Sequence, residues 1–470
     1  MSRRAPNVLF VLADEWRAQA CGYAGDTNAS TPAIDRLASE SINFEEAISG
    51  HPICAPARAS LLTGQYPLTH GVYINDVPLE PAGPTVGEVF QDAGYQTGYI
   101  GKWHLYGSPD GHYGRREEYI PPEYRFGFQY WKVGECTHDY NRSFYYEGNN
   151  PTKKYWNGYD AEAQTEDACR FMRDSAYSKR PFFLVLSYGP PHFPLDTAPA
   201  QHRRKYSERE INLRPNVPQE NAHEAAKDLR GYYSHISALD DCLDRLLSAI
   251  DASGIREETV VVFTSDHGDM MGSQGMHSEQ KLYPWEESVR VPLLMRHPPR
   301  LRPGRSPDLI NTPDIMPTLL GLCGLPIPES VQGENYFRES SRTDLPKSSA
   351  FVSMPVPVTK ALSHGIAEYR GVRNGKYTYV RSIQGPWLLY DNENDPYQMH
   401  NLCGRPETQN VQQRLETELV SWLEKLGDDF LKASEYLARD SLTHYAECNT
   451  PVGYVRSPWD DWESTLPPTS

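Results

Sequence analysis

The stretch NVLFVLA, residues 7–13, predicts a strand that is buried on both faces, because it is apolar without alternation. Runs of the same kind are TGYIG (97–101), FFLVLSY (182–188) and TVVVFTS (259–265). Amphipathic stretches between them predict helices over residues 31–41, 85–94, 160–175 and 223–254, the first with Thr31 as N-cap and Pro32 at its first position. Strands that alternate with helices indicate an α/β fold, in which helices cover both faces of a large, mainly parallel sheet.

The pattern changes after about residue 340. Residues 365–402 contain an RNGK turn between alternating segments, which predicts a small antiparallel sheet. Residues 408–440 then show helical periodicity. We therefore expect a large domain over residues 1–345 and a smaller α+β domain over residues 346–470, which ends in an irregular tail from residue 442.

The composition excludes several classes of protein. The chain of 470 residues is 39% hydrophobic and 23% charged, as in globular proteins, and its net charge of −16 argues against binding to nucleic acid or to anionic membranes. Its eight cysteines are scattered without a C-x-x-C pair, so neither a zinc knuckle nor a disulfide scaffold is indicated. The apolar run near the N-terminus ends at Asp14, and no run approaches the length of a membrane span. We expect a cytoplasmic protein, or a secreted or periplasmic one if a leader has been removed.

Polar side chains follow each predicted strand. They are Asp14 and Glu15, Lys102 and His104, His192, and finally Asp266, His267 and Asp269. Because ligands of open parallel sheets bind beyond the carboxyl ends of the strands, we expect these side chains to meet at one edge. Three carboxylates gathered there would repel one another unless a cation lies among them. Oxygen ligands favour Ca²⁺, with Mn²⁺ or Mg²⁺ as alternatives, and the histidine leaves a softer metal open.

Basic side chains accompany the predicted metal ligands. Lys102, His104, His192 and Lys281 have no obvious carboxylate partners in the sequence. Donors gathered near a metal indicate an anionic substrate with tetrahedral oxygens, such as a sulfate or phosphate ester.

The stretch HPICAPARASLLTG, residues 51–64, fits the pattern C-x-P-x-R-x-x-x-L-T-G, with Cys54 as its cysteine. In this the chain resembles the type I sulfatases of the alkaline phosphatase superfamily, which oxidise this cysteine to formylglycine. The resemblance extends through GKWH, PPHFP, TSDHGDMMGSQGM, PWEESVRVPLL and LLYDNENDPYQMHNL. It implies an alkaline-phosphatase-like sheet, a maturation enzyme that generates the formylglycine, and hydrolysis of an aryl or carbohydrate sulfate, whether a small molecule or an oligosaccharide.

The resemblance also implies a role for each site residue. The hydrate formed from Cys54 would attack sulfur, Arg58 would hold that hydrate, and His104 would accept the proton whose loss releases sulfate. Lys102 and Lys281 would contact the sulfate, while His192 or Lys281 would protonate the leaving oxygen. The metal ligands would be Asp14, Glu15, Asp266, His267 and the Cys54 product.

The sequence departs from the family pattern at two places. Position 15 usually carries Asp, Asn or Gln, and the longer Glu15 could shift its ligand oxygen or leave it outside the metal's ligands. The segment that follows Asp266 is about two residues longer than usual, so that one count selects Lys281 and another falls near Glu279. His277 is the alternative donor.

Two other functions remain open from the sequence. Phosphonate monoester and phosphodiester hydrolases share the formylglycine pattern and an Asp-His pair like Asp266–His267. A binding protein that has lost turnover is disfavoured, because every expected polar position is filled. The stretch 104–148 is rich in Tyr, His and Arg, so it is either a specificity loop or an irregular packed surface. The oligomeric state is left open.

Overall fold

The computed structural model describes residues 5–108, 113–337, 349–357 and 366–447. Within them a large sheet has ten strands in the order β10-β2-β9-β8-β1-β7-β3-β4-β5-β6. The strands are β1 Asn7–Asp14, β2 Ile42–Ile48, β3 Gln96–Lys102, β4 Tyr130–Gly134, β5 Phe144–Glu147, β6 Asn150–Tyr155, β7 Phe182–Pro191, β8 Thr259–Ser265, β9 Leu293–Arg296 and β10 Gly304–Asn311.

The four predicted strands form the centre of this sheet. They are β1, β3, β7 and β8, and they lie side by side in the order β8-β1-β7-β3, all parallel. Every residue of β1 is buried, and its side chains alternate between two cores: Val8 and Phe10 face one, Leu9 and Val11 the other. Strands β5 and β6 at one end of the sheet, and β9 between β2 and β8, are antiparallel to their neighbours, so the sheet is mixed and mainly parallel, as predicted.

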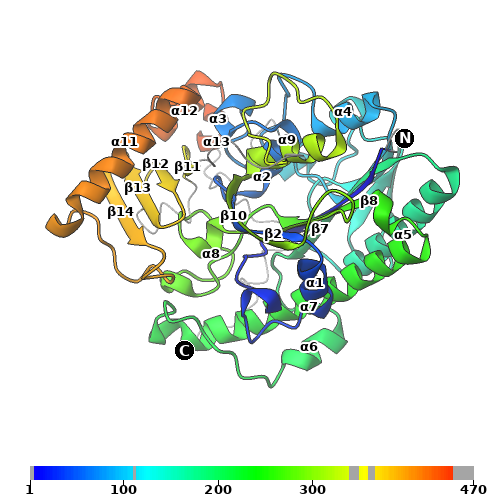
Figure 1. Ribbon diagram of the computed structural model, residues 1–470, viewed down its shortest axis with the longest axis horizontal. Helices are drawn as coiled ribbons and strands as arrows, with labels where there is room; N and C mark the ends of the chain where they lie inside the picture. The colour runs from blue at the N-terminus through cyan, green and yellow to red at the C-terminus, as the bar shows by residue number, and fades with distance from the viewer. Residues whose placement is uncertain (1–4, 109–112, 338–348, 358–365, 448–470) are drawn as a thin grey trace.

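Helices cover both faces of the sheet (Figure 1). On one face lie α1 Pro32–Ser39, α5 Asp160–Ser178, α6 Ala200–Tyr206 and α7 Ala222–Ala252, and on the other α2 Cys54–Thr63, α3 Pro67–His70, α4 Val86–Asp92 and α9 Thr312–Cys323. The short α8 Glu286–Val289 precedes β9. None of the described helices is long and apolar enough to cross a membrane.

The predicted cap of α1 is only half right. Thr31 occupies the N-cap position and Pro32 the first turn, but the Thr31 hydroxyl makes no capping bond. It donates instead to Asp35 at 3.0 Å. The free N–H groups of Ala33 and Ile34 are accepted by the carboxylate of Asp240 on α7, at 3.0 and 2.8 Å. A tertiary contact therefore replaces the local cap, which the sequence next to α1 could not reveal.

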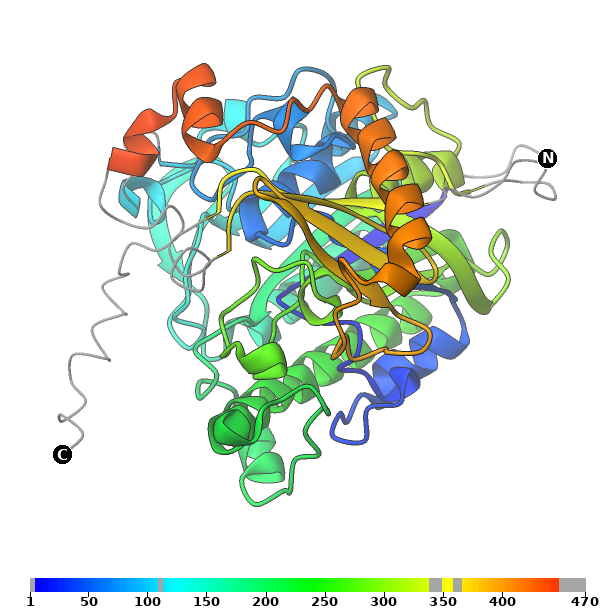
Figure 2. The same cartoon turned by 90° about the vertical axis from the view of Figure 1, so that its left-hand side faces the viewer.

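The C-terminal part forms a second sheet (Figure 2). Its order is β11 Ala350–Met354, β12 Tyr369–Arg373, β13 Tyr377–Ser382 and β14 Gly385–Asp391, all antiparallel, with the RNGK turn between β12 and β13. Helix α11 Gln409–Leu426 packs Leu415, Leu419 and Trp422 on this sheet.

The helical stretch after this sheet is not continuous. Helix α11 ends at Gly427, whose φ of 61° is left-handed, and α12 Ala433–Arg439 and α13 Thr443–Glu447 follow. The predicted irregular tail therefore begins with a short helix, and its part after residue 447 lies outside the described residues. The predicted domain boundary at residue 345 also lies outside them.

Candidate active site

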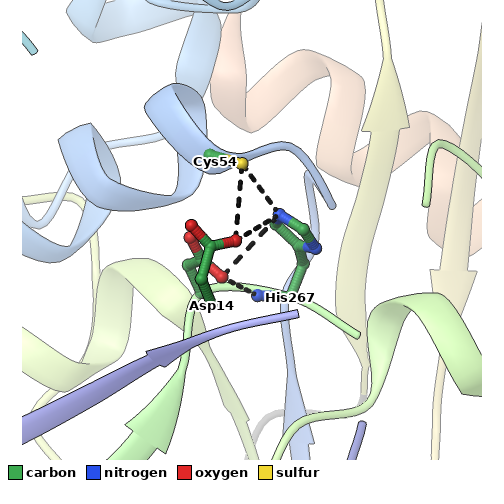
Figure 3. A group of neighbouring side chains, drawn as sticks. Asp14, Cys54 and His267 are labelled. Atoms are coloured by element: carbon green, nitrogen blue, oxygen red, sulfur yellow. Dashed lines mark hydrogen bonds and ion pairs between the residues drawn. The ribbon is translucent and has the colours of Figure 1, made fainter. Parts of the chain in front are cut away.

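The site lies where the central parallel strands end. Asp14 is the last residue of β1 and Lys102 the last of β3, while Asp266 and His267 follow β8 directly. Figure 3 shows Asp14, Cys54 and His267 pointing toward one another from β1, α2 and the segment after β8. The structure thus brings together side chains that are about 250 residues apart in the sequence, at the edge that the strand pattern predicts.

Cys54 enters the cluster from the first turn of α2. Its Sγ lies 3.2 Å from Nε2 of His267 and 3.6 Å from Oδ1 of Asp14, and the side chain is buried. The helix begins here because Ile53 is extended and Pro56 lies in the first turn, where its missing N–H is not needed. The N–H of Ala55 is accepted by Asn75 at 3.0 Å. The start of α2 is therefore fixed against the strand ends.

Arg58 lies one turn further along α2 and joins the acids of the cluster. Its Nε donates to Oδ2 of Asp266 at 3.0 Å, and its Nη2 donates to Oδ2 of Asp14 at 3.2 Å. Nη1 donates to Oγ of Ser187 and to the carbonyl of Lys102. Nε and Nη2 of this buried guanidinium therefore hold the two carboxylates in place, while Nη1 anchors it to β3 and β7.

The donors fit a divalent cation. One ligand atom each from Asp14, Cys54, Asp266 and His267 can lie within 4.8 Å of the others. The Nδ1 of His267 lies 2.9 Å from the carbonyl of Gly268, which fixes Nδ1 as the donor and leaves the lone pair of Nε2 facing the acids. Oδ1 of Asp14 faces this group, while its Oδ2 accepts from Lys102 at 2.5 Å. Two carboxylates and one imidazole form a ligand set that suits a hard divalent cation or one of borderline hardness.

Glu15 turns away from that group of four. Its carboxylate pairs with Lys281 and lies 3.3 Å from Nε2 of His192, and with Asp14 and His192 it forms a second, overlapping cluster. Its backbone is left-handed, with φ of 65°, and is held by the hydroxyl of Tyr232, which donates to the Glu15 carbonyl at 2.6 Å. The extra methylene thus carries the carboxylate toward the basic residues.

Lys281 and His192 lie beside each other next to Cys54. Lys281 Nζ lies 2.9 Å from Nε2 of His192 and 3.6 Å from Sγ of Cys54. Of the two ways of counting along the sequence, the one that selects Lys281 therefore identifies the residue that lies in the site. The alternative donor His277 is half exposed and lies 3.4 Å from Glu224 on α7, so its prediction as a site donor is wrong. Asp269 accepts the N–H groups of Met271 and Glu279, which anchors the loop that carries Lys281.

The second sheet supports this loop from behind. The hydroxyl of Tyr369 on β12 donates to the carbonyl of Leu282 at 3.1 Å. Arg373, at the end of β12, donates to the buried carboxylate of Glu286 at 3.0 Å. Lys281 thus depends on contacts from outside the large sheet.

His104, two residues after Lys102, is buried in a left-handed backbone conformation, with φ of 60°. Its N–H donates to the carbonyl of Glu135 at 2.8 Å, and the Glu135 carboxylate accepts the next three backbone N–H groups. Oδ1 of Asp76 lies 3.8 Å from Nε2 of His104. Asp76 was not singled out from the sequence.

Burial sets the protonation of the site. It raises the pKa of the Cys54 thiol to about 12, assisted by Asp14, and lowers the pKa of His104 to about 3. Burial also works to raise the pKa of Asp14, but Lys102, His192, Arg58 and His267 together outweigh it and hold that pKa well below its usual value. At pH 7 the Asp14 carboxyl is therefore ionised, while the His104 imidazole and the Cys54 thiol are neutral.

One further side chain of the 104–148 stretch reaches the site. The ring of His138 stacks on that of His192, with centroids 4.5 Å apart and planes 17° apart. The stretch thus contributes a partly exposed aromatic group beside the predicted leaving-group acid, although no motif marks it.

A mixed sheet with such a cluster at its strand ends defines a metal-dependent ester hydrolase of the alkaline phosphatase superfamily. The chain belongs to the sulfatase family: a sulfatase family model matches residues 6–325, and a model described as N-sulphoglucosamine sulphohydrolase, C-terminal, matches residues 272–425. It is a sulfuric ester hydrolase.

Curated relatives agree along nearly the whole chain. An ulvan-active sulfatase of Formosa agariphila is 41% identical over 96% of this chain and 89% of its own length. An endo-4-O-sulfatase of Bacteroides thetaiotaomicron is 30% identical over 90% and 92%.

Solved structures show the same fold. A sulfatase structure from Bacteroides fragilis superposes with a TM-score of 0.81 at 30% identity, covering 93% of this chain and 98% of its own. A phosphonate monoester hydrolase of Agrobacterium radiobacter shares the fold, with a TM-score of 0.70 at 22% identity over 92% and 97% of the two chains.

Proposed function

We propose that this sulfatase cleaves carbohydrate sulfate monoesters with a formylglycine made from Cys54 and a divalent cation, Ca²⁺ in the first place and Mn²⁺ or Mg²⁺ as alternatives. The observation that carries the proposal is the position of Cys54. Its Sγ is in contact with His267, Asp14 and Lys281 at once, at the point where the ligands of a cation and the donors for an anion meet.

The unmodified thiol is a poor nucleophile in this place. Burial raises its pKa to about 12, so the thiolate that would attack is scarce at neutral pH. When formed and hydrated, formylglycine supplies two hydroxyls on one carbon, of which one attacks sulfur and the other loses a proton as the aldehyde returns and sulfate leaves. A divalent cation held by Asp14, Asp266 and His267 would supply Lewis-acid chemistry here: it would lower the pKa of a hydroxyl at this position and neutralise ester oxygens.

We assign the other steps of the reaction to separate side chains of the site. Asp14, Asp266 and His267 hold the cation, and Arg58 fixes the two carboxylates. Glu15 stays a predicted ligand, and its carboxylate also keeps Lys281 beside His192. Lys102 and Lys281 neutralise sulfate oxygens from opposite sides, and His192 or Lys281 gives a proton to the leaving oxygen. His104 accepts the proton whose loss releases sulfate.

A carbohydrate substrate is supported by two observations. The names of the relatives cited above include an ulvan-active sulfatase, and one solved structure at 21% identity is described as a complex with a glucosamine disulfate. In this chain the 104–148 stretch places His138 over His192, and Arg116 beside Asp76, where planar groups can stack on a sugar.

Mass spectrometry tests the proposal directly. The tryptic peptide with Cys54, isolated from a host that has the maturation enzyme, should carry an aldehyde in place of the thiol. Full sulfatase turnover by protein with only unmodified cysteine would overturn the mechanism. A comparison of sulfated mono- and disaccharides, aryl sulfates and a phosphonate monoester then ranks the substrates, and a preference of several orders of magnitude in kcat/KM for the phosphonate would favour the rival hydrolase.

A further inference from the structure

We propose that Asp76 is a positioning residue for His104: its carboxylate keeps the hydrogen of the imidazole on Nε2 and thereby leaves the lone pair of Nδ1 to accept the proton when sulfate is released. The inference rests on the role that the proposed function gives to His104. The feature that motivates it is a buried acid held against a buried histidine whose two ring nitrogens have no partner within hydrogen-bond distance among the described residues.

Asp76 contacts the His104 ring at one of its two nitrogens, Nε2. Oδ1 of Asp76 lies 3.8 Å from Nε2 of His104, and both side chains are buried. A carboxylate at this distance attracts an N–H and repels a lone pair, so it selects the tautomer with hydrogen on Nε2. Hydrogen bonds of this kind are often long before substrate is bound and shorten afterwards.

Asp76 is itself fixed in place. Arg116 donates to it in a forked pair, Nε to Oδ1 at 3.1 Å and Nη2 to Oδ2 at 2.9 Å. Burial works to raise the pKa of Asp76, but Arg116 and His104 together outweigh it and hold that pKa well below its usual value. The carboxylate therefore stays ionised, and it can stabilise the imidazolium that forms when His104 accepts a proton.

The backbone is also constrained at both residues. Asp76 and His104 have φ of 66° and 60°, a conformation that side-chain-bearing residues rarely adopt and that recurs at functional sites. The Asp76 carbonyl accepts from Ser108 N–H at 2.6 Å and from the Tyr445 hydroxyl at 2.8 Å. The two side chains are thus held facing each other by several independent contacts.

The tautomer can be measured without the modified enzyme. Protein with unmodified Cys54 and ¹⁵N-labelled histidine is observed by long-range ¹H–¹⁵N correlation, and the His104 signals are assigned from their loss in His104→Gln. We expect hydrogen on Nε2 in the wild type. We expect a mixture or the reverse in Asp76→Asn, whose amide can donate to Nε2. Tyr445→Phe is the matched control, because it removes a bond to the Asp76 backbone and leaves the carboxylate, and it should keep the wild-type tautomer.

Kinetics of the matured enzyme supply a second readout. Asp76→Asn should lower kcat about 10²-fold, within the range of general base catalysis, for aryl and alkyl sulfates alike. It should leave kcat/KM almost unchanged, because the affected step follows departure of the alcohol. A structural defect would lower kcat/KM instead.

Three outcomes would overturn the proposal: hydrogen on Nδ1 in the wild type, an unchanged tautomer in Asp76→Asn, or an equal loss in kcat and kcat/KM. Even where Asp76→Asn does not fold, the position of the His104 ring hydrogen in the wild-type spectrum tests the proposal. A wild type with no sulfatase activity would refute the proposed function but would leave the measured tautomer valid.

Discussion

In the large sheet, the side chains of the site follow directly from strand ends, whereas the small antiparallel sheet reaches the site through the backbone of another segment. Asp14 and Lys102 are the final residues of β1 and β3, and adjacent ladders fix their positions. Lys281 lies in a loop, and Tyr369 and Arg373 of the small sheet hold the residues that follow it. The side of the site to which we assign the cation and the sulfate is thus part of the core, and the side to which we assign the leaving group depends on a contact between two sheets.

The difference predicts a gradient of effects. Changes at the strand ends and at Cys54 should abolish or strongly reduce chemistry, and changes in the small sheet should act weakly and selectively.

The largest effect is expected at Cys54. Cys54→Ala removes the precursor of the nucleophile, so turnover of 4-nitrophenyl sulfate should fall roughly 10⁴-fold or more, the scale of losing a nucleophile. Cys323→Ala on α9, another buried thiol, is the control and should retain turnover. Wild-type activity in Cys54→Ala would contradict the central place of this residue.

Metal removal comes next. Exhaustive chelation should abolish turnover and lower the free energy of unfolding by about 3 kcal/mol, the value for a ligand present at 100 times its Kd. Without the cation, the carboxylates of Asp14 and Asp266 keep only Arg58 and Lys102 as counter-charges. Calorimetry before and after readdition of Ca²⁺, Mn²⁺ or Mg²⁺ measures both effects and ranks the metals. Unchanged activity after chelation would remove the metal from the mechanism.

Lys102→Met should cost about 10²–10³ in kcat, as when one donor to a developing charge is lost. The matched variant is Lys132→Met on the neighbouring strand β4, where the ammonium pairs with Asp167 at 2.7 Å and is equally buried. Steady-state kinetics should show normal kcat for Lys132→Met together with lower thermal stability. Equal kinetic losses would mean that burial of a lysine in this sheet, rather than its place at a strand end, sets the effect.

The smallest effect is expected in the small sheet. Tyr369→Phe removes the bond to the Leu282 carbonyl and should lower the free energy of unfolding by about 1 kcal/mol. It should also reduce kcat a few-fold for alkyl sulfates and less for aryl sulfates, since aryl leaving groups need little protonation. Tyr379→Phe, which loses a 2.7 Å bond to Glu416 of α11, should destabilise without this selectivity. If both variants behave alike, the small sheet does not position Lys281.

The elements that could be predicted from the sequence are mainly those at the centre of the large sheet. Strand β1 and its neighbours are continuous apolar runs, so their position in the core, and the meeting of the residues that follow them, could be derived from the sequence. Strands β2 and β6 were missed, because INFEEAI and NPTKKY carry too many polar residues for an apolar run. Strand β6 is at the edge of the sheet, where such residues are tolerated, and β2 lies next to the other edge strand, β10.

Contacts between distant segments could not be derived. Asp76 meets His104 only because two loops fold against each other, and His138 stacks on His192 across 54 residues. The cap of α1 by Asp240 is of the same kind. Each depends on the register of packed elements, for which a single sequence contains no signal.

The burial of Cys54 has a consequence for the order of events during synthesis. The thiol is enclosed by His267 and Lys281, which leave the ribosome more than 200 residues after it. At 5–20 residues per second, this delay is on the order of tens of seconds. The proposed maturation enzyme, which would have to bind the backbone around Cys54, would therefore have a limited period of access on the nascent chain. Any change that accelerates closure of the central strands should then leave more of the protein with unmodified Cys54.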